Sequence, residues 1–335
     1  MSRPEPVGVG VIGAGAMGAA HLRTLVRWVP GAEARAVYDA DRPRAEQLGG
    51  EVGAEVSGSA QELIASDRVG AIVIAAPDGL HEEFALACLA AGKPTLCEKP
   101  LATSPAGSRR VVDAEVAVGR RLVQVGFMRR YDPAYVELRE LVAAGTVGPV
   151  RMVHCVHRNA QANPDATSEG VIVNSMIHEL DVVPWLLDDP VVAVTVSTPT
   201  SPPGQMRDAQ VAVLETAGGA LVTVEVFVNA RYGYDVQCEV VGDVGTVRLT
   251  PPYGLALRSH GLDGVRVSTD FVDRFADAYR IELAAWVEGV RRREVSGPTA
   301  WAGHCADTVA AAGVESLRSG RRVLVADLER PKLYR

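Results

Sequence analysis

The segment Gly13-Ala14-Gly15-Ala16-Met17-Gly18 constrains the fold of this 335-residue chain more than any other feature. A β-rich run, Val7–Ile12, precedes it, and a helical stretch, Ala16–Val29, begins inside it. The G-x-G-x-x-G spacing between a strand and a helix is typical of a turn that holds a pyrophosphate at a helix N-terminus. The segment therefore predicts a dinucleotide site. The residues expected to form it are Gly13, Gly15, Ala16, Met17 and Gly18.

Asp39 follows the next predicted strand, Glu33–Tyr38, 21 residues after Gly18. A carboxylate at this position accepts hydrogen bonds from the adenosine ribose hydroxyls. It favours NAD over NADP because it would repel a 2′-phosphate. Arg42 lies three residues further on and could partly offset this charge. NAD is the expected cofactor, and NADP stays open as an alternative.

The first 125 residues alternate between short β-rich runs and Ala-rich helical stretches. This rhythm predicts right-handed crossovers and a doubly wound parallel sheet, so residues 1–125 are expected to form an NAD-binding Rossmann domain. The expected elements after the glycine segment are Glu33–Tyr38, Arg42–Gly49, Ala71–Ala75, Glu82–Ala91, Pro94–Cys97, Pro105–Gly119 and Leu122–Val125.

Residues 126–335 show a different pattern, in which strands follow one another with few helices between them. This predicts an α+β domain with a large, mostly antiparallel open sheet. The expected helices are Ala134–Ala144, Val171–Leu187, Phe271–Arg293 and Trp301–Arg318. The expected strands are Val191–Ser197, Ala209–Thr216, Leu221–Val228, Asp235–Val241, Gly245–Leu249, Leu255–Arg258, Val265–Ser268 and Arg322–Val325.

Composition excludes several classes of protein. The 34 Lys and Arg against 41 Asp and Glu give a net charge of −7, which argues against a nucleic-acid partner. The five cysteines are scattered without a C-x-x-C pair, so neither a disulfide framework nor a metal site is expected, and reduced thiols fit a cytoplasmic protein. The sequence contains no uninterrupted run of about 18 apolar residues, so no membrane span is expected.

Further motifs point to a known family. They are Gly18-Ala19-Ala20-His21, Pro77-Asp78-Gly79-Leu80-His81, Glu98-Lys99-Pro100, the run F-M-R-R-Y-D-P at 127–133, His157-Arg158-Asn159, Ile177-His178-Glu179-Leu180-Asp181 and Y-G-Y-D-V-Q-C-E at 232–239. Together they resemble the glucose–fructose oxidoreductase/inositol dehydrogenase (Gfo/Idh/MocA) family over essentially the whole chain. The runs at 127–133 and 232–239 are the more specific, and they look most like its inositol 2-dehydrogenase members.

The resemblance implies a Rossmann domain followed by an open-sheet domain at 126–335 that binds the substrate and forms a homo-oligomer, a tetramer or dimer. It implies reversible oxidation of one secondary alcohol of a cyclitol or sugar to a ketone, with Lys99 and His178 carrying the chemistry. Ala76, Pro77, His81, Glu98 and Lys99 are then expected beside the cofactor. The residues expected at the substrate are Lys99, Arg129, Asn159, Asn174, His178 and Tyr234. The catalytic group is expected to be Lys99, His178, Asn174 and Asp181.

The residue chemistry agrees with these roles. A hydride leaves a carbinol carbon more easily as its oxygen loses a proton, and the ordinary pKa of histidine suits His178 as the base. The cation of Lys99 would stabilise the developing alkoxide. Asn174, His178 and Asp181 are spaced i, i+4, i+7, which predicts one shared helix face.

One position departs from the family pattern, because Asn174 stands where inositol dehydrogenases usually carry an aspartate. Asparagine keeps the hydrogen bonding but not the charge, which leaves the basicity of His178 and the substrate open. The alternatives are a scyllo-inositol or sugar dehydrogenase using NAD or NADP, and a catalytically silent NAD-binding sensor or co-repressor on the same fold.

Overall fold

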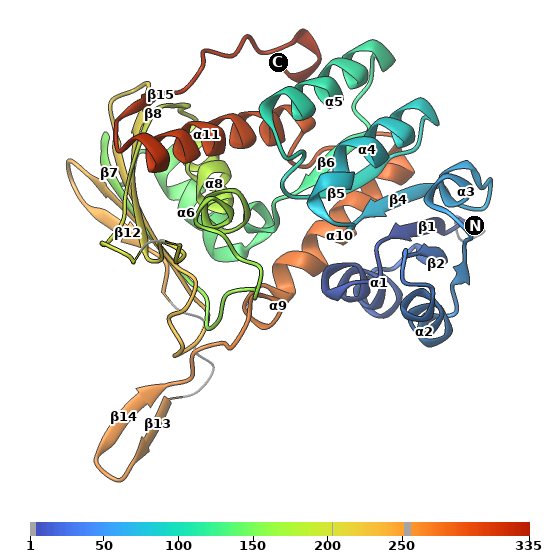
Figure 1. Cartoon of the computed structure of the whole chain (residues 1–335), viewed down its shortest axis with the longest axis horizontal. Helices are drawn as coiled ribbons and strands as arrows, with labels where there is room; N and C mark the ends of the chain where they lie inside the picture. Colours follow the sequence, from blue (N-terminus) through green and yellow to red (C-terminus); the bar gives the residue numbers. More distant parts are fainter. Residues whose placement is uncertain (1–4, 203, 251–255) are drawn as a thin grey trace. The chain divides into compact units, whose positions relative to one another are not determined.

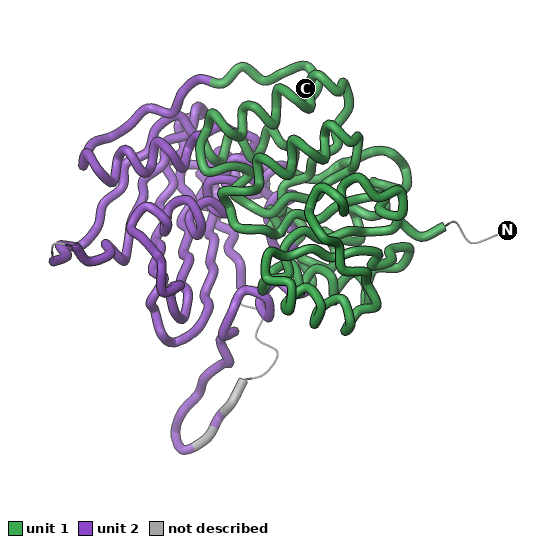
Figure 2. Tube along the Cα trace, turned by 45° about the vertical axis from the view of Figure 1, so that its right-hand side comes forward, with its two compact units in different colours: residues 1–131, 277–307, 328–335 green, residues 132–276, 308–327 purple. Residues whose placement is uncertain are grey.

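The computed structural model describes residues 5–202, 204–250 and 256–335 (Figure 1). The chain forms two compact units, of which unit 1 contains residues 1–131, 277–307 and 328–335 and unit 2 contains residues 132–276 and 308–327 (Figure 2). These units differ from a single division after residue 125, because two late segments return to unit 1. The assignment of 1–125 to NAD binding and of 126–335 to substrate binding and oligomerisation remains a prediction.

Unit 1 is built on a six-stranded parallel sheet in the order β3-β2-β1-β4-β5-β6. This order confirms the predicted doubly wound Rossmann sheet. The two-residue strand β3 and the helix that follows it were not predicted, because both are too short to show a periodic pattern. The strands are β1 (Val7–Ile12), β2 (Ala32–Tyr38), β3 (Glu55–Val56), β4 (Ala71–Ile74), β5 (Thr95–Glu98) and β6 (Val123–Gly126).

Helices from both ends of the chain pack in unit 1. Leu283 and Trp286 of α10 share one core cluster with Val9 of β1 and Leu22 of α1, so a late helix completes a core that the first residues begin. The helices of this unit are α1 (Ala16–Trp28), α2 (Arg42–Val52), α3 (Ala60–Ala65), η1 (Asp78–Leu80), α4 (His81–Ala90), α5 (Pro105–Val118), η2 (Met128–Tyr131), nearly all of α10 (Ala276–Arg292), the first part of α11 (Ala300–Ser319) and η4 (Lys332–Tyr334).

Unit 2 contains a seven-stranded sheet in the order β12-β11-β7-β10-β9-β8-β15. Its neighbours are antiparallel except for the parallel pair β10 and β7, which confirms the mostly antiparallel sheet. The strands are β7 (Val150–Arg158), β8 (Val191–Ser197), β9 (Gln210–Thr216), β10 (Leu221–Phe227), β11 (Asp235–Gly242), β12 (Thr246–Arg248) and β15 (Val323–Leu324).

Two strand predictions need correction. The central strand β7 was missed, because its sequence V-R-M-V-H-C-V-H-R carries polar residues that hide its alternation. A predicted strand at Val265–Ser268 is wrong, because the hairpin instead pairs β13 (Ala256–Ser259) with β14 (Leu262–Val265) in a separate sheet. Leu255, the expected start of the first of these strands, lies outside the described residues.

The helices of unit 2 are α6 (Pro133–Ala143), α7 (Ser168–Gly170), the π-helix η3 (Val171–Met176), α8 (Ile177–Leu187), α9 (Phe271–Arg274) and the remainder of α11. The predicted continuous helix Phe271–Arg293 is interrupted at Phe275, whose φ of −112° and ψ of 21° are not helical. In Figure 1, α6 and α8 lie on the same side of the large sheet. The helical run Ser168–Leu187 is long and apolar enough to cross a membrane, but 61% of its apolar window is buried, as in a core helix.

Candidate active site

The glycine segment forms a tight turn between β1 and α1. Gly13 has φ +101°, and a Cβ there would lie 2.3 Å from the Ala75 carbonyl oxygen. A Cβ at Gly18 would lie 1.8 Å from the Gly13 carbonyl oxygen, so the fold itself requires both glycines. A Cβ at Gly15, the N-cap of α1, would meet no neighbouring atom within 4 Å in the part of the chain that the structure describes. This open space at a helix N-terminus fits a pyrophosphate, with Ala16 and Met17 in the first helical turn.

The carboxylate of Asp39 is fixed by the backbone on both of its oxygens. Oδ2 accepts a 2.7 Å hydrogen bond from the N–H of Ala14, and Oδ1 accepts a 2.8 Å bond from the N–H of Asp41. Arg42 does not face this carboxylate, since its Nε donates to Glu46 at 2.8 Å along its own helix. Arg44 is the nearby cation, with Nη1 at 3.6 Å from Asp39 Oδ2. Asp39 therefore lies where the spacing predicted it, at the end of β2, and the role of Arg42 at the cofactor stays a prediction.

His81 occupies a buried position between two loops of unit 1. Its Nε2 lies 2.8 Å from the carbonyl oxygen of Ala76, and its Nδ1 lies 2.7 Å from that of Pro100. Both ring nitrogens are therefore engaged with the backbone. His81 connects the loop that carries Ala76 and Pro77 to the loop that follows Lys99.

The segment Glu98–Ala102 is held at several points. The Glu98 carboxylate is buried, and its Oε1 lies 2.6 Å from Nε2 of His21. The other oxygen accepts a 3.3 Å bond from the N–H of Lys99. The N–H of Ala102 donates to Asp307 Oδ2 at 3.1 Å. These contacts fix the backbone on both sides of Lys99.

Lys99 has an unusual electrostatic environment for a half-buried lysine. Burial lowers its pKa, and the positive charge of Arg129, itself buried, acts in the same direction. Glu98 and Asp78 act in the opposite direction but do not cancel the effect. Burial alone would raise the pKa of Glu98, but His21 and the neighbouring positive charges hold it below its ordinary value. The pair is therefore an ionised carboxylate next to a lysine that loses its proton more readily than usual.

The second group of predicted residues lies in unit 2, where the helix around His178 is not a simple α-helix. Asn174 belongs to the π-helix η3, whereas His178 and Asp181 belong to α8. Asn174 is exposed, while His178 and Asp181 are buried. The i→i+5 bonding of a π-helix widens the turn. The side chains of Asn174 and His178 are therefore not aligned as residues i and i+4 of a regular α-helix would be. Single-turn π-helices occur often at functional sites, and no residue pattern predicted this one.

A chain of aromatic contacts connects His178 to Tyr234 through His157. The ring of His157 lies 6.0 Å from the ring of His178 and 5.7 Å from that of Tyr234, measured between centroids. His157 Nδ1 also contacts Glu179 Oε2 at 3.2 Å. The ring of His157 therefore lies near the rings of both Tyr234 and His178. His157 was not predicted as a site residue, although inward alternation along β7 would have found it.

Asn159 follows the end of β7, close to this cluster in sequence. Its N–H donates to the Phe227 carbonyl oxygen at 3.0 Å, and its own carbonyl oxygen accepts from the N–H of Ala230 at 2.9 Å. Its side-chain Oδ1 is buried and has no hydrogen-bond partner among the described residues. An acceptor left open in this way fits a ligand hydroxyl.

Taken together, the Rossmann sheet, the glycine turn and the carboxylate fixed at the end of β2 are features of an NAD-dependent oxidoreductase. Residues 7–127 match the model of the GFO_IDH_MocA oxidoreductase family with its NAD-binding Rossmann fold, and residues 135–248 match the C-terminal domain of the same family. The chain belongs to this family, as its motifs indicated.

Named relatives extend the match over nearly the whole chain. Inositol 2-dehydrogenase 1 of Saccharopolyspora erythraea is 48% identical, covering 98% of this chain and 99% of the relative. Inositol 2-dehydrogenase of Pseudomonas fluorescens is 44% identical, covering 97% and 98%. The structure of myo-inositol dehydrogenase from Lactobacillus casei in complex with NAD(H) and myo-inositol superimposes with a TM-score of 0.94 at 35% identity, covering 98% of this chain and 100% of that one.

Proposed function

We propose that this protein oxidises one secondary alcohol of a cyclitol to a ketone with NAD, and that its substrate is myo-inositol, oxidised at carbon 2. The similarity to inositol 2-dehydrogenases over nearly the full length of both chains carries the choice of substrate. The exposed side chain of Asn174, the imidazole of His178 and the open acceptor of Asn159 support a polyhydroxylated ligand, because each offers a hydrogen bond to a hydroxyl.

In this proposal the glycine turn binds the pyrophosphate and Asp39 binds the adenosine ribose. The nicotinamide, when bound, supplies the hydride acceptor. His178 removes the proton of the reacting hydroxyl, and Asp181 orients it from the same helix. Lys99 stabilises the alkoxide as it forms, and burial lowers its pKa, so that it gives up a proton more readily than an ordinary lysine. Arg129, Asn159 and Tyr234 are assigned to the remaining hydroxyls.

Lys99→Ala tests the chemical role. The variant should lower kcat by roughly 10² or more, because it removes alkoxide stabilisation, and should leave NAD affinity nearly intact. Stopped assays of NADH formation give kcat, and fluorescence titration gives the NAD Kd. Lys332→Ala removes an exposed lysine of the same unit and serves as the control. Turnover close to wild type in Lys99→Ala would end the assignment of Lys99.

A panel of cyclitols and sugars with NAD and NADP tests the substrate. The proposal expects the highest kcat/KM for myo-inositol with NAD. A higher kcat/KM for scyllo-inositol or a sugar would show that the proposed substrate is wrong, but it would leave the proposed type of reaction unchanged. Intact NAD binding without turnover of any polyol would favour a silent sensor instead.

We also propose that the protein is a homo-oligomer, a tetramer or dimer, formed through the large sheet of unit 2. One face of this sheet leaves apolar side chains in solvent, including Met152 at 38%, Val211 at 43% and Leu221 at 47% exposure. Burial of such a face against a second copy would remove this surface from water. Light scattering coupled to size exclusion measures the mass, and a monomer at micromolar concentration would contradict the proposal.

A further inference from the structure

The segment 228–234, named here the Tyr234 loop, connects β10 to β11 and carries a predicted substrate residue. Three backbone hydrogen bonds connect it and the end of β10 to residues 159 and 160, including the bond from the Arg231 N–H to the Ala160 carbonyl oxygen at 3.1 Å. The N–H of Tyr234 donates to the Ser268 carbonyl oxygen at 2.6 Å. The loop and the Asn159 segment therefore form one hydrogen-bonded structure.

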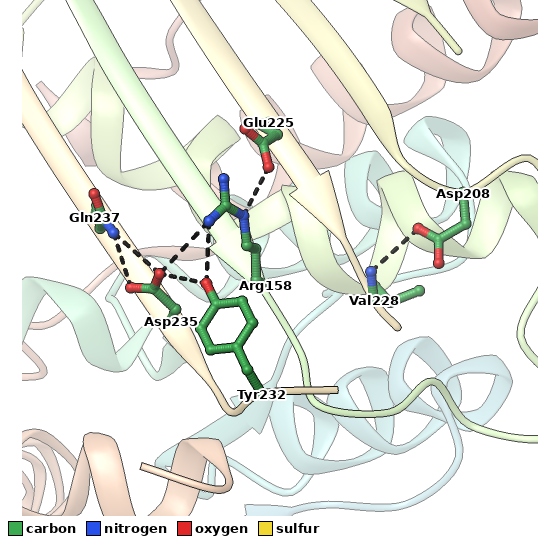
Figure 3. Close-up of polar contacts among 7 residues, drawn as sticks. All are labelled: Arg158, Asp208, Glu225, Val228, Tyr232, Asp235 and Gln237. Carbon is green, nitrogen blue, oxygen red and sulfur yellow. Dashed lines mark hydrogen bonds and ion pairs between the residues drawn. The ribbon is translucent and has the colours of Figure 1, made fainter. Parts of the chain in front are cut away.

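Arg158 lies at the centre of a polar network on the face of the large sheet that points away from His157 (Figure 3). Its Nε donates to Glu225 Oε1 at 2.7 Å, and its Nη1 donates to the Tyr232 hydroxyl at 3.1 Å. That hydroxyl donates in turn to Asp235 Oδ2 at 2.6 Å. Gln237 binds both oxygens of Asp235 at 3.1 and 3.0 Å. The network ties the loop, through Tyr232, to three neighbouring strands.

Alternation along β7 places this network opposite the candidate site. Successive side chains of a strand point to opposite faces, so Arg158 points away from the buried face that His157 occupies. The loop repeats this arrangement, because Tyr232 reaches Arg158 on one face while Tyr234 packs against His157 on the other. Gly233 separates the two tyrosines with φ +151°, and a Cβ there would lie 2.8 Å from the Ser268 carbonyl oxygen.

We propose that Arg158 and Tyr232 are positioning residues that hold the Tyr234 loop in the conformation that binds the substrate. Neither reaches the candidate site. Each fixes the outer side of the loop, so that Tyr234 stays against His157, whose ring also lies 6.0 Å from that of His178. The inference rests on the proposed function for its substrate, but the holding of the loop itself does not depend on that function.

Tyr232→Phe and Arg158→Met test this role. Loss of the hydroxyl or the guanidinium frees the outer side of the loop, so the KM for myo-inositol should rise about fivefold in Tyr232→Phe and further in Arg158→Met, with the NAD Kd unchanged within about twofold. Arg158→Lys, which keeps a donor, should recover part of the loss. Arg151→Met is the matched control, because Arg151 lies on the same strand and forms an exposed two-bond pair with Asp243 at 2.7 and 2.8 Å.

Hydrogen exchange separates this inference from the proposed function. The amides of residues 229–234 should exchange faster in Tyr232→Phe and Arg158→Met than in wild type or Arg151→Met, whether or not myo-inositol is the substrate. Unchanged exchange in both variants would overturn the inference, as would an equal rise of KM in Arg151→Met. A changed oligomer mass in Arg158→Met with normal loop exchange would also overturn it. Failure of the wild type to oxidise any polyol would overturn only the proposed function.

Discussion

Asp307→Asn should change how the stability of unit 1 depends on pH. Asp307 lies in α11 and is almost fully buried, and its Oδ2 accepts the hydrogen bond from the N–H of Ala102 next to the Lys99 segment. Its Oδ1 has no hydrogen-bond partner among the described residues. Burial raises the pKa of Asp307 to about 8, and the charge of Asp78 adds to the rise, although the Ala102 hydrogen bond opposes it. The carboxyl is therefore protonated in the folded protein at neutral pH.

The size of the effect follows from proton linkage. The pKa of an aspartate in an unfolded chain is about 3.9. Between this pH and about 8, the folded state therefore holds a proton that the unfolded chain has lost. The stabilisation is complete below the lower value and is lost as pH rises toward the upper one. Each pH unit in this window lowers the free energy of unfolding by about 1.4 kcal/mol. Asparagine is neutral at every pH in this window, and its amide oxygen still accepts the hydrogen bond from Ala102. The free energy of unfolding of the variant should therefore lack this dependence on pH.

Urea unfolding at pH 5, 6 and 7 measures the difference. The free energy of unfolding of Asp307→Asn relative to wild type should increase by about 3 kcal/mol from pH 5 to pH 7. Asp113→Asn removes an exposed carboxylate that pairs with Arg109 at 2.8 Å in the same unit, and its difference from wild type should stay flat. Parallel pH curves for wild type and Asp307→Asn would show that Asp307 is ionised, and the reasoning from burial would be refuted.

Three other substitutions give further tests. Asn174→Asp should move the acidic limb of the pH profile of kcat/KM to higher pH, by on the order of 0.5 pH units or more, because a carboxylate near His178 favours the imidazolium. A limb that does not move would show that residue 174 does not affect the pKa of the catalytic base. Asp39→Ala should shift the ratio of kcat/KM toward NADP by at least about tenfold, because like charges brought together cost several kcal/mol and Arg44 remains beside the site. Preference for NADP in the wild type would contradict this. Tyr334→Phe should lower the free energy of unfolding by about 1–3 kcal/mol, measured in urea, because it leaves the buried Glu115 without the donor that now lies 2.5 Å from its Oε2. An unchanged unfolding midpoint would show that the contact is dispensable.

Features that depend on neighbours in sequence were predicted well. The glycine turn and Asp39 follow from the spacing of a strand, a turn and a helix, because local geometry alone requires them. The same reasoning placed Lys99 at the end of a buried strand. It did not show that Arg44 lies beside Asp39, because the position of an arginine side chain on a helix depends on the partner that it contacts in the fold.

Features that depend on distant parts of the chain were not predicted. Nothing local to Trp286 shows that its helix completes a core begun by Val9. The π-helix depends on how residues 171–176 pack, and no residue type marks it. Polar side chains lie on both faces of β7, so its sequence does not alternate regularly between apolar and polar residues. For this reason neither the strand nor the buried His157 was predicted.

The discontinuity of unit 1 has a consequence for synthesis on the ribosome. Residues 1–131 emerge first, but the core around β1 lacks Leu283, Trp286 and Val287 until α10 has been translated. All of residues 132–276 of unit 2 emerge in the interval. The nascent Rossmann sheet must therefore keep apolar surface exposed while most of the chain is still being made, which is when chaperone binding is most useful. The hydrogen bond between Glu115 and Tyr334 joins residues 219 positions apart, so Glu115 waits for its partner until Tyr334 has been translated.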